Sequence, residues 1–141
     1  MRIIGFGLIA GGIMFLIGGL FHLLVPALFP HIKDDYVNRA LFRPWEGWTQ
    51  RYMVIHPFLL GVLFAAAYSL LVGLSGESRA LRGMSGGVLY GLGLSLLGSL
   101  PVFALSFVSF QVSGRVVATW AVQNVAQYAI AGAVLGAWLR R

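Results

Sequence analysis

Three side-chain amides in an otherwise apolar stretch are the residues best suited to chemistry in this sequence. Gln123, Asn124 and Gln127 recur with Trp120 at helical spacing, so they share one arc of a helix predicted over residues 116–139. Because an unpaired amide in hydrocarbon is costly, the arc must face other helices or water. Two interpretations are open: interhelical hydrogen bonds, or the wall of a polar cavity that contacts a solute or a lipid head group.

Two histidines suggest a second kind of chemistry. His22 and His56 are expected at similar depth on consecutive antiparallel apolar stretches, and two facing imidazoles could ligate a b-type haem. Each stretch holds a single histidine near its end, so hydrated histidines at the membrane interface are the simpler interpretation. We expect no cofactor, with haem b bound through His22 and His56 as the alternative.

A third group of residues could bind a divalent metal ion. His31 and Asp35 are four residues apart and would share a helix face, with Asp34 and Glu46 nearby in the sequence. No recognised ligand spacing is present, and acidic residues also suit the solvated start of a helix, so we predict no metal site.

Familiar catalytic motifs are absent from the sequence. It has no GxSxG elbow, no P-loop, no HExxH and no dinucleotide fingerprint, and none of its carboxylates or lysines lies in an apolar stretch. Ion-coupled transport usually needs such an intramembrane group. We therefore expect a protein that is not an enzyme.

The composition indicates an integral membrane protein of one domain, residues 1–141. Hydrophobic residues make up 59% of the chain and charged residues 10%, whereas soluble domains carry about 25% charged residues. The lipid bilayer is therefore the expected partner. The net charge is +6, but the basic residues stand singly or in pairs at the ends of apolar runs, which argues against nucleic-acid binding.

Four uncharged stretches are long enough to cross a bilayer as helices: residues 3–29, 52–74, 84–110 and 116–139. They predict an all-α, integral membrane four-helix bundle with both termini on one side. The basic residues divide five against five between the two sides. We place the termini in the cytoplasm of a bacterial or archaeal cell, with the protein in the cytoplasmic membrane.

The long polar stretch, residues 31–51, predicts a short amphipathic helix in the membrane interface. Its apolar residues recur at helical spacing from Ile32 to Leu41, and Pro44 ends the pattern. A turn through residues 43–48 would follow, with four side chains in the interfacial loop: Arg43, Trp45, Glu46 and Trp48. If the protein has a site, this stretch is its expected lid, and otherwise it anchors the bundle.

The glycines predict close packing of helices. The chain has 19 glycines, and three pairs stand four residues apart in apolar stretches: Gly7/Gly11, Gly87/Gly91 and Gly132/Gly136. The spacing does not separate contacts within one chain from contacts between chains. A shift of 75 residues also aligns Gly18 with Gly93 and Pro26 with Pro101, as a duplicated helical hairpin would.

These patterns support three hypotheses about function. The leading one is a membrane protein that acts by helix packing, as a homo-oligomer or as an accessory subunit of a larger membrane complex. The second is a small permeation or ligand-binding protein that uses an outer polar cavity. The third is a haem-binding redox subunit.

One segment carries a resemblance to other proteins. The sequence LFRPWE at residues 41–46, leading into His56-Pro57-Phe58, resembles a pattern in small four-span bacterial and archaeal membrane proteins of unknown function. The similarity covers residues 38–61 and extends to a similar Gly-rich third span. It implies a four-span fold, and it implies no activity.

Overall fold

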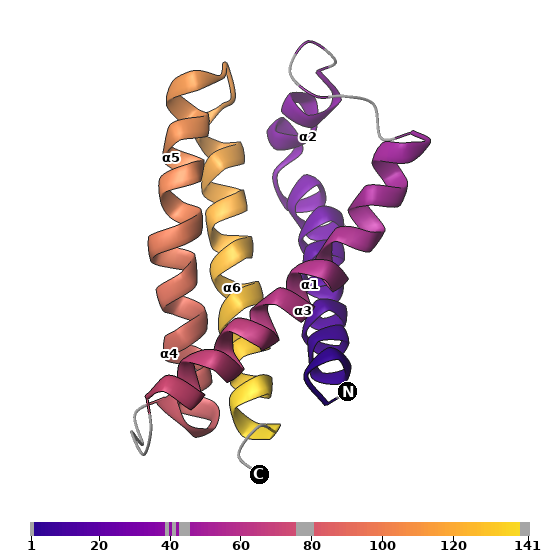
Figure 1. Ribbon diagram of the computed structural model, residues 1–141. Coiled ribbons are helices and arrows are strands. Elements are labelled where there is room, and N and C mark those ends of the chain that lie inside the picture. Colours follow the sequence, from indigo (N-terminus) through magenta and orange to yellow (C-terminus); the bar gives the residue numbers. More distant parts are fainter. Residues whose placement is uncertain (1, 39, 41, 43–45, 76–80, 139–141) are drawn as a thin grey trace.

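The computed structural model describes residues 2–38, 40, 42, 46–75 and 81–138, and these residues form an all-α bundle (Figure 1). The elements are α1 (Arg2–Leu28), α2 (Pro30–Val37), α3 (Trp48–Leu74), α4 (Gly83–Leu94), a π-helical turn η2 (Ser95–Ser99), α5 (Leu100–Ser109) and α6 (Gly114–Trp138). Because α4, η2 and α5 are continuous, the described ranges contain five helices.

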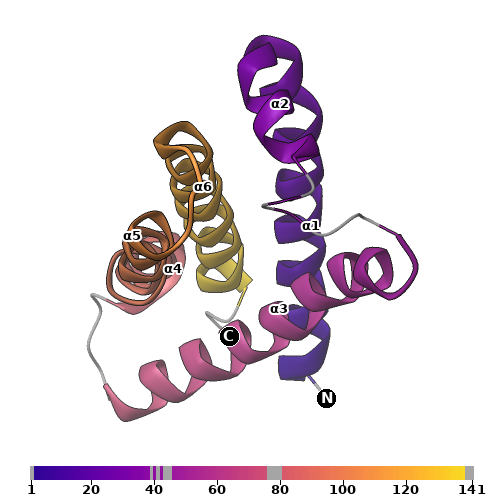
Figure 2. The same ribbon diagram turned by 90° about the horizontal axis from the view of Figure 1, so that it is seen from above.

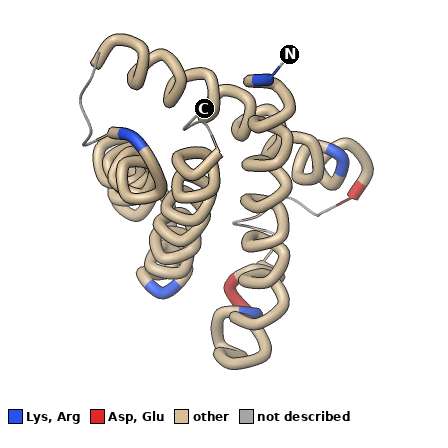
Figure 3. The backbone as a smooth tube through the Cα atoms, turned by 90° about the horizontal axis from the view of Figure 1, so that it is seen from below, with Lys and Arg blue, Asp and Glu red and all other residues tan. Residues whose placement is uncertain are grey.

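Three of the helices are long and apolar enough to cross a membrane. These are α1, α3 and the continuous helix over residues 83–109, each of 27 residues, or about 40 Å at 1.5 Å per residue. Large apolar side chains point outward from all three, as at Leu23, Leu63 and Leu97, which are 72%, 67% and 83% exposed. The charged residues that the structure describes lie near the ends of the helices (Figure 3). The chain is therefore an integral membrane protein whose apolar helices suggest contact with the bilayer.

The helices pack as two pairs, α1 with α3 and α4 with α6. At the first crossing, a Cβ atom on Gly61 would overlap the backbone of Gly7 and Gly11. At the second crossing, a Cβ atom on Gly87 would overlap the Gly132 carbonyl group. Backbones approach this closely only where side chains are missing. The glycine pairs found in the sequence thus make their contacts inside one chain.

An aromatic core joins the two pairs. Phe64 and Tyr68 of α3 pack on Tyr90 of α4, with ring centroids 4.8 and 5.0 Å from that of Tyr90. The Tyr90 hydroxyl donates to the Phe64 carbonyl (3.0 Å), and the Tyr68 hydroxyl donates to the Leu81 carbonyl (2.7 Å). The buried phenols therefore have their polar atoms paired, as the bundle interior requires.

The core lies toward one end of the bundle, where α1 begins and α6 ends (Figure 1). Figures 1 and 2 show α3 crossing α1 obliquely and running toward the start of α4. The first half of α3 is consequently splayed away from α5 and α6. Space for a site is thus created at the α2 end of the bundle.

The α2 helix is shorter than the sequence pattern predicts. It ends at Val37 rather than continuing to Leu41, and Asn38 is extended (φ −70°, ψ 101°). The backbone N–H of Ala40 donates to the side-chain oxygen of Asn38 (3.0 Å). Asparagine often ends a helix in this way, because its side chain competes for backbone groups.

The α3 helix begins four residues before the predicted start of the second span. Its first residue is Trp48, after Gly47 at φ 59°, so Trp48 belongs to the helix and not to the predicted turn. Hydropathy marks where a helix becomes apolar and cannot mark a polar first turn. Arg43, Pro44 and Trp45 of the predicted turn lie outside the described residues.

Candidate functional site: a pocket between α1, α3 and α6

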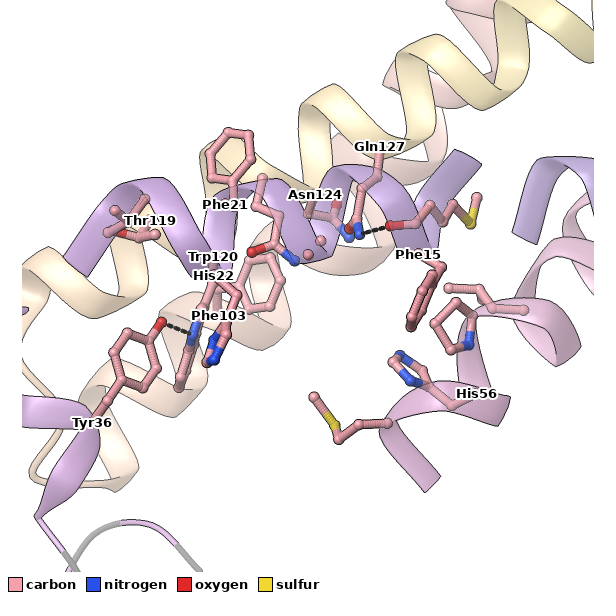
Figure 4. A pocket seen from close by; sticks show the side chains of 18 of the residues that line it. Phe15, Phe21, His22, Tyr36, His56, Phe103, Thr119, Trp120, Asn124 and Gln127 are labelled. Atoms are coloured by element: carbon pink, nitrogen blue, oxygen red, sulfur yellow. Dashed lines mark hydrogen bonds between the residues drawn. The ribbon is translucent and has the colours of Figure 1, made fainter. Parts of the chain in front are cut away.

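A cavity of about 620 Å³ lies in the half of the bundle where α3 diverges (Figure 4). Its walls come mainly from α1, α3 and α6. Three further aromatic side chains complete the lining: Tyr36 of α2, Phe42 and Phe103 of α5. The structure brings all six cavity candidates from the sequence to this one pocket: His22, His56, Trp120, Gln123, Asn124 and Gln127. Pro101, which a shift of 75 residues aligns with the lining residue Pro26, is exposed and is not part of the lining.

Three polar side chains of α6 in this pocket are paired with other helices. The Trp120 Nε1–H donates to the Tyr36 hydroxyl of α2 (2.8 Å). Asn124 Oδ1 accepts from the hydroxyl of Ser95 in η2 (2.8 Å), and Gln127 Nε2 donates to the Met14 carbonyl of α1 (2.6 Å). These three bonds join α6 to α2, η2 and α1. Trp120, Asn124 and Gln127 thus serve as interhelical hydrogen-bonding groups.

Gln123 differs from its neighbours on the polar arc. It makes no hydrogen bond to any other residue that the structure describes, although it is only partly exposed. Its amide faces α1, because a Cβ atom on Gly18 would lie 3.4 Å from Gln123 Nε2. The amide therefore keeps both a donor and an acceptor for a molecule in the pocket.

His56 supplies a second polar group without a partner. Its Nδ1 is buried and has no hydrogen bond within the described chain. The ring stacks on Tyr52, one helical turn earlier, with centroids 5.4 Å apart and planes 14° apart. A buried polar atom without a partner is uncommon in a folded protein and marks a position where a ligand or a water can bind.

His22 also lines the pocket, but at a different level from His56. Pro57 and Phe58 contact α1 at Gly11, and Phe58 stacks on Phe15. His22 lies seven residues beyond Phe15, or about 10 Å further along α1. The similar depth expected for the two histidines is not observed, and this offset does not suit axial ligation of one haem iron by both.

The α2 helix and Phe42 cover the pocket, with Tyr36 and Phe42 among the lining residues. Besides the bond between Tyr36 and Trp120, the Ser113 hydroxyl donates to Asp35 Oδ2 (2.6 Å) and ties α2 to the segment between α5 and α6. Burial raises the pKa of the Tyr36 phenol, and the nearby Asp35 charge adds to this, although the bond from Trp120 opposes it. The phenol therefore stays neutral at physiological pH.

The remaining predicted residues lie outside this pocket. Within the described ranges, no three His, Cys, Asp or Glu side chains gather around a point that could hold a metal ion. His31 is exposed, and the Asp35 carboxylate accepts a hydrogen bond from the Ser113 hydroxyl. Glu46 and Trp48 of the predicted interfacial loop are exposed at the start of α3, and Arg43 and Trp45 are not described.

Sequence reasoning missed the partners of the amides. Ser95 is fully buried and pairs with Asn124, a contact that the sequence pattern does not predict. The Ser106 hydroxyl donates to the Val102 carbonyl of its own helix. A serine flanked by leucines does not indicate whether its side chain points into the bundle or away from it. Here that orientation depends on the π-helical turn, which the sequence pattern does not predict.

Comparison with known proteins does not identify a relative of this chain. No protein-family model matches the chain, and no curated protein and no solved structure is significantly similar to it. The resemblance of residues 38–61 to other four-span proteins stays a prediction. The function must therefore be argued from the pocket itself.

Proposed function

We propose that this protein is a four-span membrane protein that binds a small lipophilic molecule in the pocket between α1, α3 and α6. The observation that carries the proposal is the pocket, which is largely apolar and holds two polar groups, His56 Nδ1 and the Gln123 amide, without a hydrogen bond to any described residue. Its volume of about 620 Å³ falls within the roughly 300–1,000 Å³ of small-molecule sites, which commonly pair an apolar wall with a few polar groups.

The α6 helix serves as the fourth span in this proposal. It has 25 residues, or about 37 Å, and its charged residue Arg115 lies at its start. Its amides lower its hydropathy, but they face the bundle interior and not the bilayer, because two of them bond to η2 and α1. The α2 helix lies in the interface above the pocket.

Binding is favoured over permeation by the aromatic core. A pore needs an open path through both halves of the bundle, but the core closes the half beyond the pocket. Phe64, Tyr68 and Leu135 are 3%, 2% and 1% exposed. Close-packed side chains of this kind leave no path for a solute. The pocket therefore acts as a binding site that ends within the membrane.

The glycine pairs do not favour the packing hypothesis. Their spacing fitted contacts within one chain or between chains, and in the structure they contact each other within one chain. A role as an oligomer or accessory subunit stays a prediction, but no contact in the described residues favours it over ligand binding. The pocket contains no intramembrane carboxylate or lysine among its lining residues, so we propose binding without catalysis.

Native mass spectrometry of the protein released from detergent tests this proposal. The wild type should retain one lipophilic molecule per chain, and Gly19→Leu should lose it. Gly19 lines the pocket, and a Cβ atom there meets no atom within 4 Å, so leucine fills the pocket without displacing a helix.

Gly93→Leu is the matched control, because Gly93 also has open space and does not line the pocket. This variant should retain the molecule. If the wild type carries no defined adduct, or if both variants retain it equally, the proposal is wrong.

A further inference from the structure

We propose that the ligand of this pocket is an uncharged lipophilic alcohol whose hydroxyl group hydrogen-bonds to His56. The inference rests on the proposed function and deepens it by naming the ligand class. Three features of the pocket carry it: the charge of its lining, the unpaired Nδ1 atom of His56 and the aromatic walls. Each restricts a different part of the ligand.

The lining restricts the charge of the ligand. In the part of the chain that the structure describes, none of the lining residues is Asp, Glu, Lys or Arg. A carboxylate or a phosphate that leaves water needs a paired cation or several donors to offset its lost hydration. Among the described residues, the pocket offers an acidic head group no lysine or arginine side chain. Fatty acids and anionic phospholipid head groups are therefore disfavoured against a neutral molecule.

The His56 ring restricts the polar group. Nδ1 is buried without a partner in the described chain, and Gln123 on the facing helix also has an unpaired amide. In neutral histidine, Nδ1 is either a donor or an acceptor, depending on the tautomer. A hydroxyl group can both donate and accept, so it satisfies either tautomer. A ketone or an ester carbonyl accepts only and would satisfy one of them.

The walls restrict the body of the ligand. Phe15, Phe21, Phe103 and Trp120 line the pocket together with Leu60 and Met53 (Figure 4). Contact with aromatic and aliphatic side chains is most favourable when the ligand is itself apolar, because apolar surface of both partners is then removed from water. The pocket lies between helices whose outer faces are apolar, so a molecule dissolved in the bilayer has the shortest route to it. An alcohol with a hydrocarbon or isoprenoid chain meets all three restrictions.

Photolabelling in phosphatidylcholine nanodiscs tests the inference with three diazirine probes of equal chain length: hexadecanol, hexadecanoic acid and hexadecane. The alcohol should label pocket peptides several-fold more strongly than the acid or the hydrocarbon. His56→Phe should lower labelling by the alcohol about three- to tenfold, the range for one lost hydrogen bond, and leave the hydrocarbon unchanged. Gln123→Leu should act in the same direction.

His31→Phe and Gln50→Leu are the matched controls, since both residues are exposed and lie outside the pocket. His56→Asn retains a polar atom close to the position of Nδ1 and should keep most of the alcohol labelling, which separates hydrogen bonding from folding.

The outcomes distinguish the two proposals. If the acid labels as strongly as the alcohol, or if His56→Phe and Gln123→Leu label like their controls, the ligand class is wrong and pocket labelling by the hydrocarbon still supports binding. If Gly19→Leu reduces labelling of pocket peptides by none of the probes, the proposed binding function is wrong as well.

Discussion

Two glutamines one helical turn apart on α6 show how much the surroundings decide a residue's role. Gln127 donates to the Met14 carbonyl of α1 at 2.6 Å, whereas Gln123 has no partner among the described residues. Their side chains are identical, and the sequence places both on the same polar arc. The structure separates them into a group that holds helices together and a group that is available to a ligand.

We therefore expect opposite effects from the same substitution at the two positions. Gln127→Leu removes an interhelical hydrogen bond and should lower the free energy of unfolding by about 1 kcal/mol, the upper range for such bonds in membrane bundles. Gln123→Leu removes an unpaired amide and should leave stability unchanged or raise it. Reversible unfolding in mixed micelles measures both. Equal destabilisation by the two variants would contradict the assignment.

At the residue scale, the sequence was informative about which side chains share a surface. Helical spacing was enough to place Trp120, Gln123, Asn124 and Gln127 on one arc, because an α-helix has a fixed period. Their partners could not be predicted. The contacts with Ser95 and Met14 depend on a π-helical turn and on a backbone carbonyl, and neither has a sequence signal. The covering helix was predicted, but its pattern does not show that Tyr36 meets Trp120.

At the scale of elements, glycines set the distance between helices. Gly61 and Gly87 each lie against the backbone of the facing helix, so neither position has room for a methyl group. Gly93 is also within an apolar helix but faces open space. The same residue type is thus essential for packing at two positions and replaceable at a third.

Substitution with alanine should separate these positions. Gly61→Ala and Gly87→Ala should destabilise the bundle by about 1–3 kcal/mol, because the helices must move apart. Gly93→Ala should be neutral or stabilise by up to about 1 kcal/mol, since alanine favours helices. Thermal unfolding followed by circular dichroism in detergent checks this. Tolerance of alanine at Gly61 and Gly87 would show that the helices do not cross there.

The helices themselves were predictable to within a few residues, but their ends were not. Hydropathy located α1 and the helix over residues 83–109 closely, whereas α3 starts at Trp48 and not at Tyr52. The polar first turn of α3 has no hydropathy signal. The early end of α2 depends on the Asn38 side chain, which accepts from the Ala40 N–H instead of allowing another helical turn.

At the scale of the whole molecule, two helix pairs cross at glycines and meet at an aromatic core. The pairs α1–α3 and α4–α6 both cross at glycines. The duplication suggested by a shift of 75 residues stays a prediction. Because the core fills one half of the bundle, the splayed half contains the pocket. The position of the pocket is therefore a consequence of the oblique path of α3 (Figure 1).

The proposed four-span topology can be tested with single cysteines, because the chain contains no cysteine of its own. Single cysteines at the exposed residues Asn38 and Gln111 should react with a membrane-impermeant maleimide from one side of the membrane. A cysteine at Ser85, exposed near the start of α4, should react from the other side. If the Gln111 and Ser85 positions react from the same side, the helix over residues 83–109 does not span the bilayer.

A lipophilic molecule that occupies the pocket lies beside Trp120, because the ring of this residue lines the wall. With Trp45, Trp48 and Trp138 changed to phenylalanine, Trp120 is the sole tryptophan, and a brominated long-chain alcohol in nanodiscs should quench its fluorescence. We expect saturable quenching at about one alcohol per chain, abolished by Gly19→Leu. Quenching that rises linearly with alcohol and is unchanged by Gly19→Leu would contradict binding in the pocket.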